Sequence, residues 1–143
     1  MTTLDKFSEY LDNDFSANYW ADDAIDYATE LATLLSDNEW HRLKQTWRYK
    51  PVNWQFKCAE AVFGTEKPQA IDLLEKMLTS TEVKVALAAA EGLEASDWKP
   101  NTNNTFAALE KLLNELEENE RSTVENLMER SEHDMQHAQL AYG

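Results

Sequence analysis

Two histidines near the end of the sequence have the spacing of a zinc-binding pair. In HDMQH, His133 and His137 are four residues apart, so both would lie on one face of a helix. Asp134 stands where a zinc protease has its general-base glutamate, and no third ligand follows in the last residues of the sequence. The remaining histidine, His41, is far away in the sequence. We therefore expect no metal site.

Cys58 is the single cysteine and the most reactive side-chain type in the chain. As a nucleophile it would need a histidine partner and an exposed, electropositive setting. It lies instead between Trp54 and Val62 on an apolar stripe, which predicts a small core residue. Adjacent carboxylates such as Asp22 and Asp23 are more typical of a solvated face than of an acid–base couple. Because the three glycines are also too scattered for a phosphate loop, we expect no catalytic residue, no cofactor and no enzyme activity.

The charge of the chain indicates which partners it can bind. Asp and Glu number 27 against 13 Lys and Arg, which gives a formal net charge of −14. Such a chain is poorly suited to bind the phosphates of nucleic acid or an anionic membrane surface. It favours a basic protein partner, attracted over about 8 Å at physiological salt. The alternative, that the charge serves solubility alone, stays open.

Apolar residues recur at helical spacing along the chain, which predicts an all-α fold in one domain, residues 1–143. Ser36 and Glu39 match a capping box, and Pro51 and Pro68 each suit the first turn of a helix. Short connections make neighbouring helices antiparallel. We expect about eight helices and no strand. Their apolar residues fall in segments 4–15, 25–35, 36–50, 51–63, 68–78, 82–95, 106–116 and 122–135.

Two of the expected helices, over 51–63 and 82–95, are apolar on nearly all sides, so they should lie in the middle of the protein. Thr79 and Glu82 match a capping box that would open the second of them. KCAEAVFG in the first recurs loosely as LAAAEGLE in the second, about 31 residues later. A repeated two-helix unit indicates a short HEAT-like α-solenoid. An irregular helical bundle is the alternative.

The segment from Trp40 to Ala59, which we call the basic belt, contains no acidic residue. Arg48 and Lys50 at the C-terminal end of a helix complement its dipole, and the other cations can pair with the acidic terminal helices folded beside the belt. We favour this structural role over the alternative that the belt is a binding site anchored by Trp and Arg. The belt contains three of the five tryptophans, Trp40, Trp47 and Trp54, and five cations, Arg42, Lys44, Arg48, Lys50 and Lys57.

The stretch WRYKPVNWQFKCAEA, residues 47–61, resembles a motif of small all-helical immunity proteins from bacterial contact-dependent growth-inhibition and polymorphic-toxin systems. Beyond these residues the chain agrees with that family in helical pattern and charge. Many such proteins resemble HEAT-like stacks of helices, are strongly acidic and act in the cytosol. The matching positions are Trp47, Arg48, Pro51, Trp54, Gln55, Cys58, Ala59 and Glu60.

This resemblance implies a tight inhibitor that binds the C-terminal domain of a cognate toxin in a 1:1 complex. Such a domain is often a basic nuclease, with a ribonuclease favoured here. Because a nuclease site is electropositive, an acidic surface can cover it with fast, salt-sensitive association. The matched positions are expected to determine the fold rather than to contact the toxin.

Acidic residues concentrate in the first 35 residues, where eight of them stand against Lys6 alone. Carboxylates beside exposed Tyr and Trp have the composition of a protein interface. Alternatively, the two aromatic residues cap the core where the first two helices meet. The predicted partner-binding residues are Asp12, Asp14, Tyr19, Trp20, Asp22, Asp23, Asp26 and Glu30.

A second function class is a helical-repeat adaptor that holds a peptide or a partner helix in a groove. Micromolar binding to a short peptide, without affinity for a folded basic domain, would favour it. In either class we expect a cytoplasmic protein. The N-terminus lacks the pattern of a signal peptide, no run of 18 apolar residues exists, and one cysteine cannot form an intramolecular disulfide.

Overall fold

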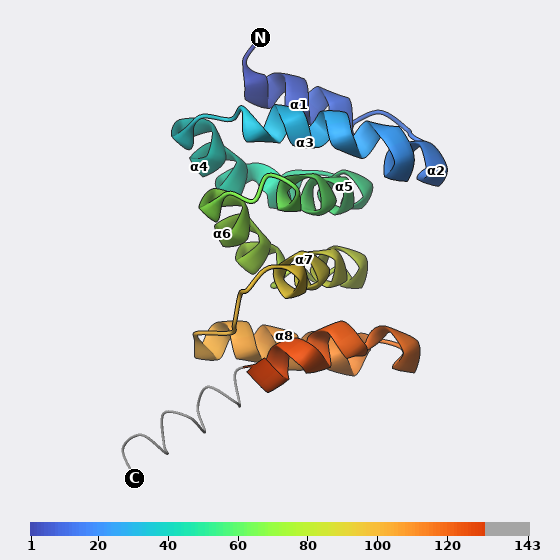
Figure 1. The fold of residues 1–143 in the computed structure, drawn as a ribbon, viewed down its shortest axis with the longest axis vertical. Helices are drawn as coiled ribbons and strands as arrows, with labels where there is room; N and C mark the ends of the chain where they lie inside the picture. Colours follow the sequence, from blue (N-terminus) through green and yellow to red (C-terminus); the bar gives the residue numbers. More distant parts are fainter. Residues whose placement is uncertain (131–143) are drawn as a thin grey trace.

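A computed structural model describes residues 1–130, which form helices and no β-strand (Figure 1). The predicted all-α fold is confirmed. Residues 1–130 form eight helices when α2, η1 and α3, which follow one another without a break, are counted as one. The elements are α1 (Thr3–Leu11), α2 (Ala17–Tyr19), the π-helix η1 (Trp20–Ala24), α3 (Ile25–Thr33), α4 (Asp37–Thr46), the 3-10 turn η2 (Trp47–Tyr49), α5 (Val52–Phe63), α6 (Pro68–Met77), α7 (Val83–Ala95), α8 (Asn103–Glu115), the 3-10 turn η3 (Glu118–Glu120), and a helix over residues 122–130.

The helices stack in pairs along the long axis of the molecule (Figure 1). α1 packs on α3 at one end, α4–α5 and α6–α7 follow, and α8 with residues 122–130 completes the stack. α3, α5 and α7 contact one another in turn and form one row, and α4 contacts α6 in a second row. This is the arrangement of a short α-solenoid, the first of the two predicted architectures. Across residues 1–130, no helix has both the length and the apolar character of a membrane span.

α5 and α7 lie in the middle of the stack, as their apolar composition predicted (Figure 1). Cys58 and Ala59 of α5, and Ala89 and Leu93 of α7, are fully buried. Small residues on both helices let the two axes approach closely, and neighbours on two sides exclude water from the larger side chains.

Side-chain caps open four of the α-helices, α1, α2, α4 and α8. Ser36 and Glu39 form the predicted box at the start of α4. The predicted box of Thr79 and Glu82 is wrong: Glu82 caps α7 without a side-chain hydrogen bond. Its backbone amide donates instead to Ser80 Oγ, 3.1 Å away, in the loop that precedes the helix.

Glu39 also joins two layers of the stack. Its Oε1 accepts from the backbone amide of Ser36 at 3.0 Å, and its Oε2 accepts from that of Leu4 in α1 at 2.7 Å. These bonds, the first above all, hold the pKa of Glu39 below its ordinary value of 4.5. The carboxylate therefore stabilises the folded protein above about pH 4.5, and this contribution is lost as the pH falls through the lower folded pKa.

Glu39→Gln is expected to lower the free energy of unfolding by about 1 kcal/mol at pH 7, because two backbone amides lose a charged acceptor. The difference from the natural protein should shrink towards pH 3, where the natural carboxyl group is itself becoming protonated. Urea unfolding of both proteins at the two pH values measures this. A loss of the same size at both would show that the charge of Glu39 is not what stabilises the contact.

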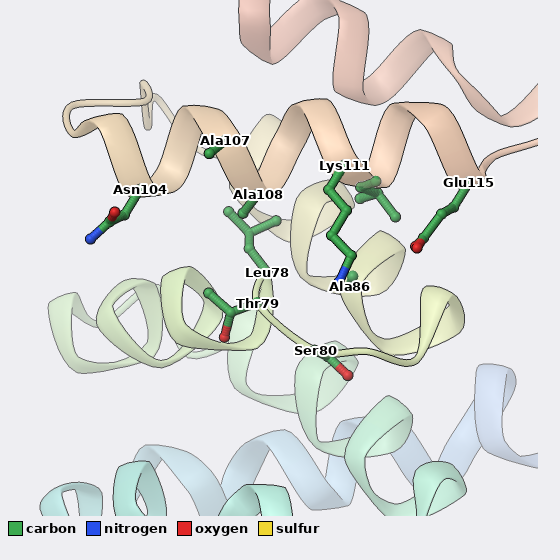
Figure 2. A pocket seen from close by; sticks show the side chains of 10 residues that line it. Leu78, Thr79, Ser80, Ala86, Asn104, Ala107, Ala108, Lys111 and Glu115 are labelled. Carbon is green, nitrogen blue, oxygen red and sulfur yellow. The ribbon is translucent and has the colours of Figure 1, made fainter.

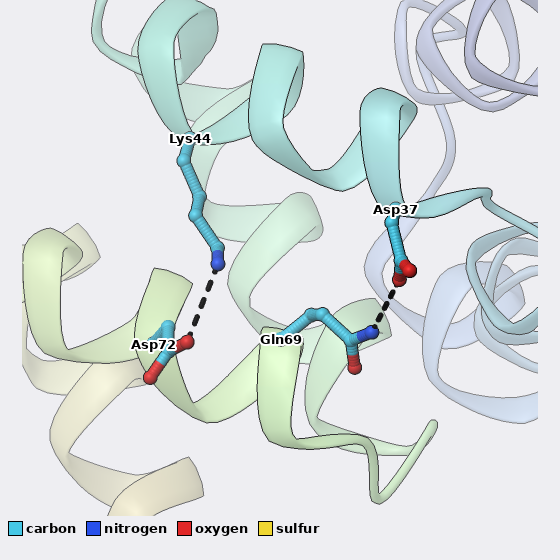
Figure 3. Close-up of polar contacts among 4 residues, drawn as sticks. All are labelled: Asp37, Lys44, Gln69 and Asp72. Atoms are coloured by element: carbon cyan, nitrogen blue, oxygen red, sulfur yellow. Dashed lines mark hydrogen bonds and ion pairs between the residues drawn. The ribbon is translucent and has the colours of Figure 1, made fainter.

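The basic belt makes contacts that hold the fold together. Trp40, Trp47 and Trp54 are all buried. Lys44 Nζ of α4 lies 3.3 Å from Asp72 Oδ2 of α6, and beside this ion pair Gln69 Nε2 donates to Asp37 Oδ1 at 2.8 Å (Figure 3). Lys57 Nζ donates to the carbonyl of Asn13 at 2.7 Å. These contacts favour a structural role for the belt, but Lys44 pairs with α6 and not with an acidic terminal helix as expected.

Candidate protein-binding surface

The six predicted acidic residues are all exposed and lie at the N-terminal end of the stack. Two follow α1 in the loop before α2, two lie in the π-helix η1, and two lie in α3. In that order they are Asp12, Asp14, Asp22, Asp23, Asp26 and Glu30. Across residues 1–130, none of the six forms an ion pair with a cationic side chain.

Tyr27 packs against Tyr10 of α1, and Tyr19 and Asp23 lie near enough to affect the pKa of Tyr10. The Tyr10 and Tyr27 rings meet edge-on, with centroids 4.7 Å apart. Burial raises the pKa of Tyr10, and the nearby Tyr19, Tyr27 and Asp23 raise it further. Tyr19 is 51% exposed and Tyr27 48% exposed, so both offer ring surface to a partner. We call Tyr19, Asp23 and Tyr27 the tyrosine face.

Tyr27 was missed in the sequence-based prediction, although its spacing could have revealed it. It follows Asp23 by four residues and Tyr19 by eight, so the three share one side of a continuous helix. The prediction began this helix near Ile25, where the regular apolar spacing starts. In the structure Ser16 caps it earlier, accepting from the amide of Tyr19 at 3.2 Å.

Phe15 fixes the loop that carries Asp12 and Asp14. Its ring stacks on Trp20, with centroids 5.8 Å apart, and lies 5.1 Å from that of Tyr10. Lys57 lies close to both acids, and its pKa is lowered chiefly by burial, with Asp14 and Asp12 acting in the opposite direction. Lys57 therefore balances part of the negative charge of Asp12 and Asp14. The acids of η1 and α3 should attract a cationic partner more strongly.

Trp20 is a core residue and does not act as an exposed anchor beside Tyr19. It is 6% exposed, and its Nε1 donates to Glu60 Oε1 of α5 at 2.9 Å. The alternative interpretation, in which an aromatic residue caps the core at this end, therefore describes Trp20. The physical reason is that α5 offers an acceptor for the indole N–H while Phe15 covers the ring.

The positions that carry the family resemblance build the junction between α4 and α5. Buried Gln55 donates through Nε2 to the carbonyls of Arg48, at 3.3 Å, and Lys50, at 2.7 Å. Trp54 donates to the carbonyl of Ser8 in α1 at 3.0 Å. Cys58 is fully buried, and burial raises the pKa of its thiol. These contacts support the fold and leave no reactive thiolate there.

Metal ligation finds no support in the described part of the chain. Residues 1–130 contain no group of three or more His, Cys, Asp and Glu side chains that could hold a metal ion. The predicted pair His133 and His137 lies outside the described residues.

Comparisons with known proteins do not assign the chain to a family. It matches no family model, and comparisons with curated proteins and with solved structures give no similar protein. The function is therefore argued from the surface that the fold presents.

Proposed function

We propose that this protein is an immunity protein of a contact-dependent growth-inhibition or related toxin system. It binds the C-terminal domain of a cognate toxin in the cytoplasm as a 1:1 complex and neutralises it. The toxin domain is a basic nuclease, with a ribonuclease favoured. The tyrosine face carries the proposal: Tyr19 and Tyr27 lie exposed to either side of Asp23 in sequence, on one continuous helix whose other acids are unpaired within residues 1–130.

The composition of this surface suits protein recognition better than solubility alone. Exposed tyrosines give a partner a large contact area and lose little conformational entropy on binding, and they are enriched among interface anchors. Carboxylates beside them attract a cationic surface and raise the association rate. Solubility would explain the carboxylates but not the two half-exposed tyrosines.

Reversing the charge of Asp22 and Asp23 together to Lys is expected to slow association with the toxin domain by about tenfold or more at low salt. Both side chains are exposed, so the fold should be retained. Stopped-flow measurements give the association rates of both proteins at low and high salt. The difference between these rates should become smaller as salt screens the charges. The toxin can be sought as the basic C-terminal domain of a large secreted protein encoded beside this gene.

Glu117 and Glu118 changed together to Lys are the matched control, because they carry the same charge change and are also exposed but follow α8 at the other end of the stack. Their variant should bind at nearly the natural rate. Equal slowing in both variants would assign the effect to net charge and argue against an N-terminal acidic site.

A helical-repeat adaptor is the second candidate, and a hollow of about 380 Å³ favours it (Figure 2). Leu78, Thr79 and Ser80 border it below α8, and Ala108 and Lys111 of α8 border it above. A short apolar peptide segment could lie there. Calorimetry against amphipathic peptides, run beside the basic toxin domain, decides between the two functions: micromolar peptide binding without toxin binding favours the adaptor.

A further inference from the structure

A second feature lies on the row formed by α3, α5 and α7. These helices border a hollow of about 220 Å³, and none of its lining residues belongs to the tyrosine face. Its surface is largely apolar, and two carboxylates, those of Glu60 and Glu91, stand in it. Solenoids use the surface formed by one row of helices to bind partners, because it is continuous across repeats. The apolar lining consists of Ile25, Ala59, Phe63, Ala88 and Gly92.

Within residues 1–130, no cation pairs with the two carboxylates. Across residues 1–130, neither Glu60 nor Glu91 forms an ion pair, although Glu60 accepts the Trp20 indole N–H through Oε1. Glu91 keeps contact with solvent, yet partial burial raises its pKa, and the charges of Glu60, Glu94 and Glu120 raise it further. A cation placed here would relieve this repulsion.

We propose that this hollow binds an arginine side chain of the basic partner. The inference rests on the proposed function for the identity of that partner, and it departs from the expectation for the matched positions by giving Glu60 a contact with the partner besides its bond to Trp20. The aliphatic part of the arginine side chain would lie on the apolar lining, and the guanidinium group would lie between Glu60 and Glu91.

Arginine fits this hollow better than lysine for three reasons. Its planar group has five N–H donors, enough to bond two carboxylates at once. It is less strongly hydrated than an ammonium group, so its transfer into a partly apolar hollow is easier. Phe63, 36% exposed, offers a ring surface on which a guanidinium group can stack.

The test uses the full chain and an acetylated, amidated tripeptide of arginine, followed by backbone-amide NMR. The shifts should gather at Ile25, Glu60, Phe63, Ala88 and Glu91. Glu60→Gln with Glu91→Gln should weaken peptide binding about tenfold, since the charges that the guanidinium meets are removed. Glu60→Gln keeps an acceptor for the Trp20 indole, and Glu91→Gln alone tests the site if the double variant is less stable.

Two controls separate this site from general attraction to an acidic protein. Glu82→Gln with Glu110→Gln removes the same charge at exposed positions that do not border the hollow, and it should change the affinity less than about twofold. A lysine tripeptide of equal charge should bind several-fold more weakly than the arginine peptide. Equal effects of the two double variants, equal binding of the two peptides, shifts gathered at α1 and the tyrosine face instead of the hollow, or no saturable binding would each overturn the inference.

The peptide experiment is independent of the toxin experiment. If the arginine peptide fails to bind in the hollow while the chain still inhibits the toxin domain, the hollow is wrongly assigned and the proposed function stands. If the peptide binds as expected but no basic toxin domain is bound, the arginine site stands and its partner belongs to another class.

Discussion

Replacing Trp54 by alanine is expected to lower the free energy of unfolding by about 3–5 kcal/mol. Trp54 is 2% exposed, and its ring meets Phe7 edge-on at a centroid distance of 6.3 Å. Its Nε1 donates to the carbonyl of Ser8 at 3.0 Å. The change would therefore leave a cavity between α5 and α1 and remove the hydrogen bond that joins them. Urea unfolding followed by circular dichroism at 222 nm measures the loss.

One further variant separates the hydrogen bond of Trp54 from its packing, and a second is a control at an exposed aromatic residue. Trp54→Phe keeps a ring against Phe7 but loses the N–H donor, so its cost should be smaller, about 1–2 kcal/mol. Tyr49→Ala, at 82% exposure in the neighbouring turn, should change stability by less than about 0.5 kcal/mol. If Trp54→Ala lowered the stability no more than Tyr49→Ala, the contacts of Trp54 would not be what holds α5 against α1.

Much of the fold could be predicted from the sequence because its determinants are local. Pro68 occupies the first turn of α6, and Ser36 with Glu39 opens α4 through contacts three residues apart. The central position of α5 and α7 also follows from local composition, since a helix that is apolar on two sides must be covered on two sides.

The helical spacing of apolar residues predicted the end of α1 wrongly. Leu11 and Phe15 are four residues apart, so the apolar pattern continues into the loop. The helix ends at Leu11 because Asn13 turns back, its Nδ2 donating to the carbonyls of Tyr10 at 3.0 Å and Glu9 at 3.4 Å. An asparagine side chain that competes for backbone carbonyls is easily overlooked when only apolar residues are counted.

The candidate surface was predicted only in part, because it depends on contacts between distant residues. Trp20 bonds Glu60, forty positions later in the sequence, and Lys57 bonds the carbonyl of Asn13. No local pattern shows such pairs. The sequence therefore indicated the acidic N-terminal region correctly as an exposed surface, but it could not show which of two adjacent aromatic side chains turns towards the core.

The same substitution at Tyr19 and at Trp20 should for this reason lower the stability by different amounts. Trp20→Ala is expected to lower the free energy of unfolding by about 3 kcal/mol or more, since a buried ring stacked on Phe15 is removed together with the hydrogen bond to Glu60. Tyr19→Ala should cost about 1 kcal/mol or less, because its exposed ring makes mainly one contact, with Phe15.

Toxin affinity should depend more on Tyr19 than on Trp20, which is the reverse of their expected order for stability. If the tyrosine face is the interface, Tyr19→Ala should weaken binding by about tenfold or more, as expected for an aromatic anchor. Trp20→Phe keeps a ring in the core and should weaken binding by the folded fraction less than Tyr19→Ala does, because it affects the surface only through the lost hydrogen bond to Glu60. Isothermal titration at a temperature where both variants are folded makes the comparison. Unaltered affinity in Tyr19→Ala, with a clear loss in Trp20→Phe, would argue against the tyrosine face and leave the proposed arginine site, to which Glu60 belongs, as the contact with the toxin.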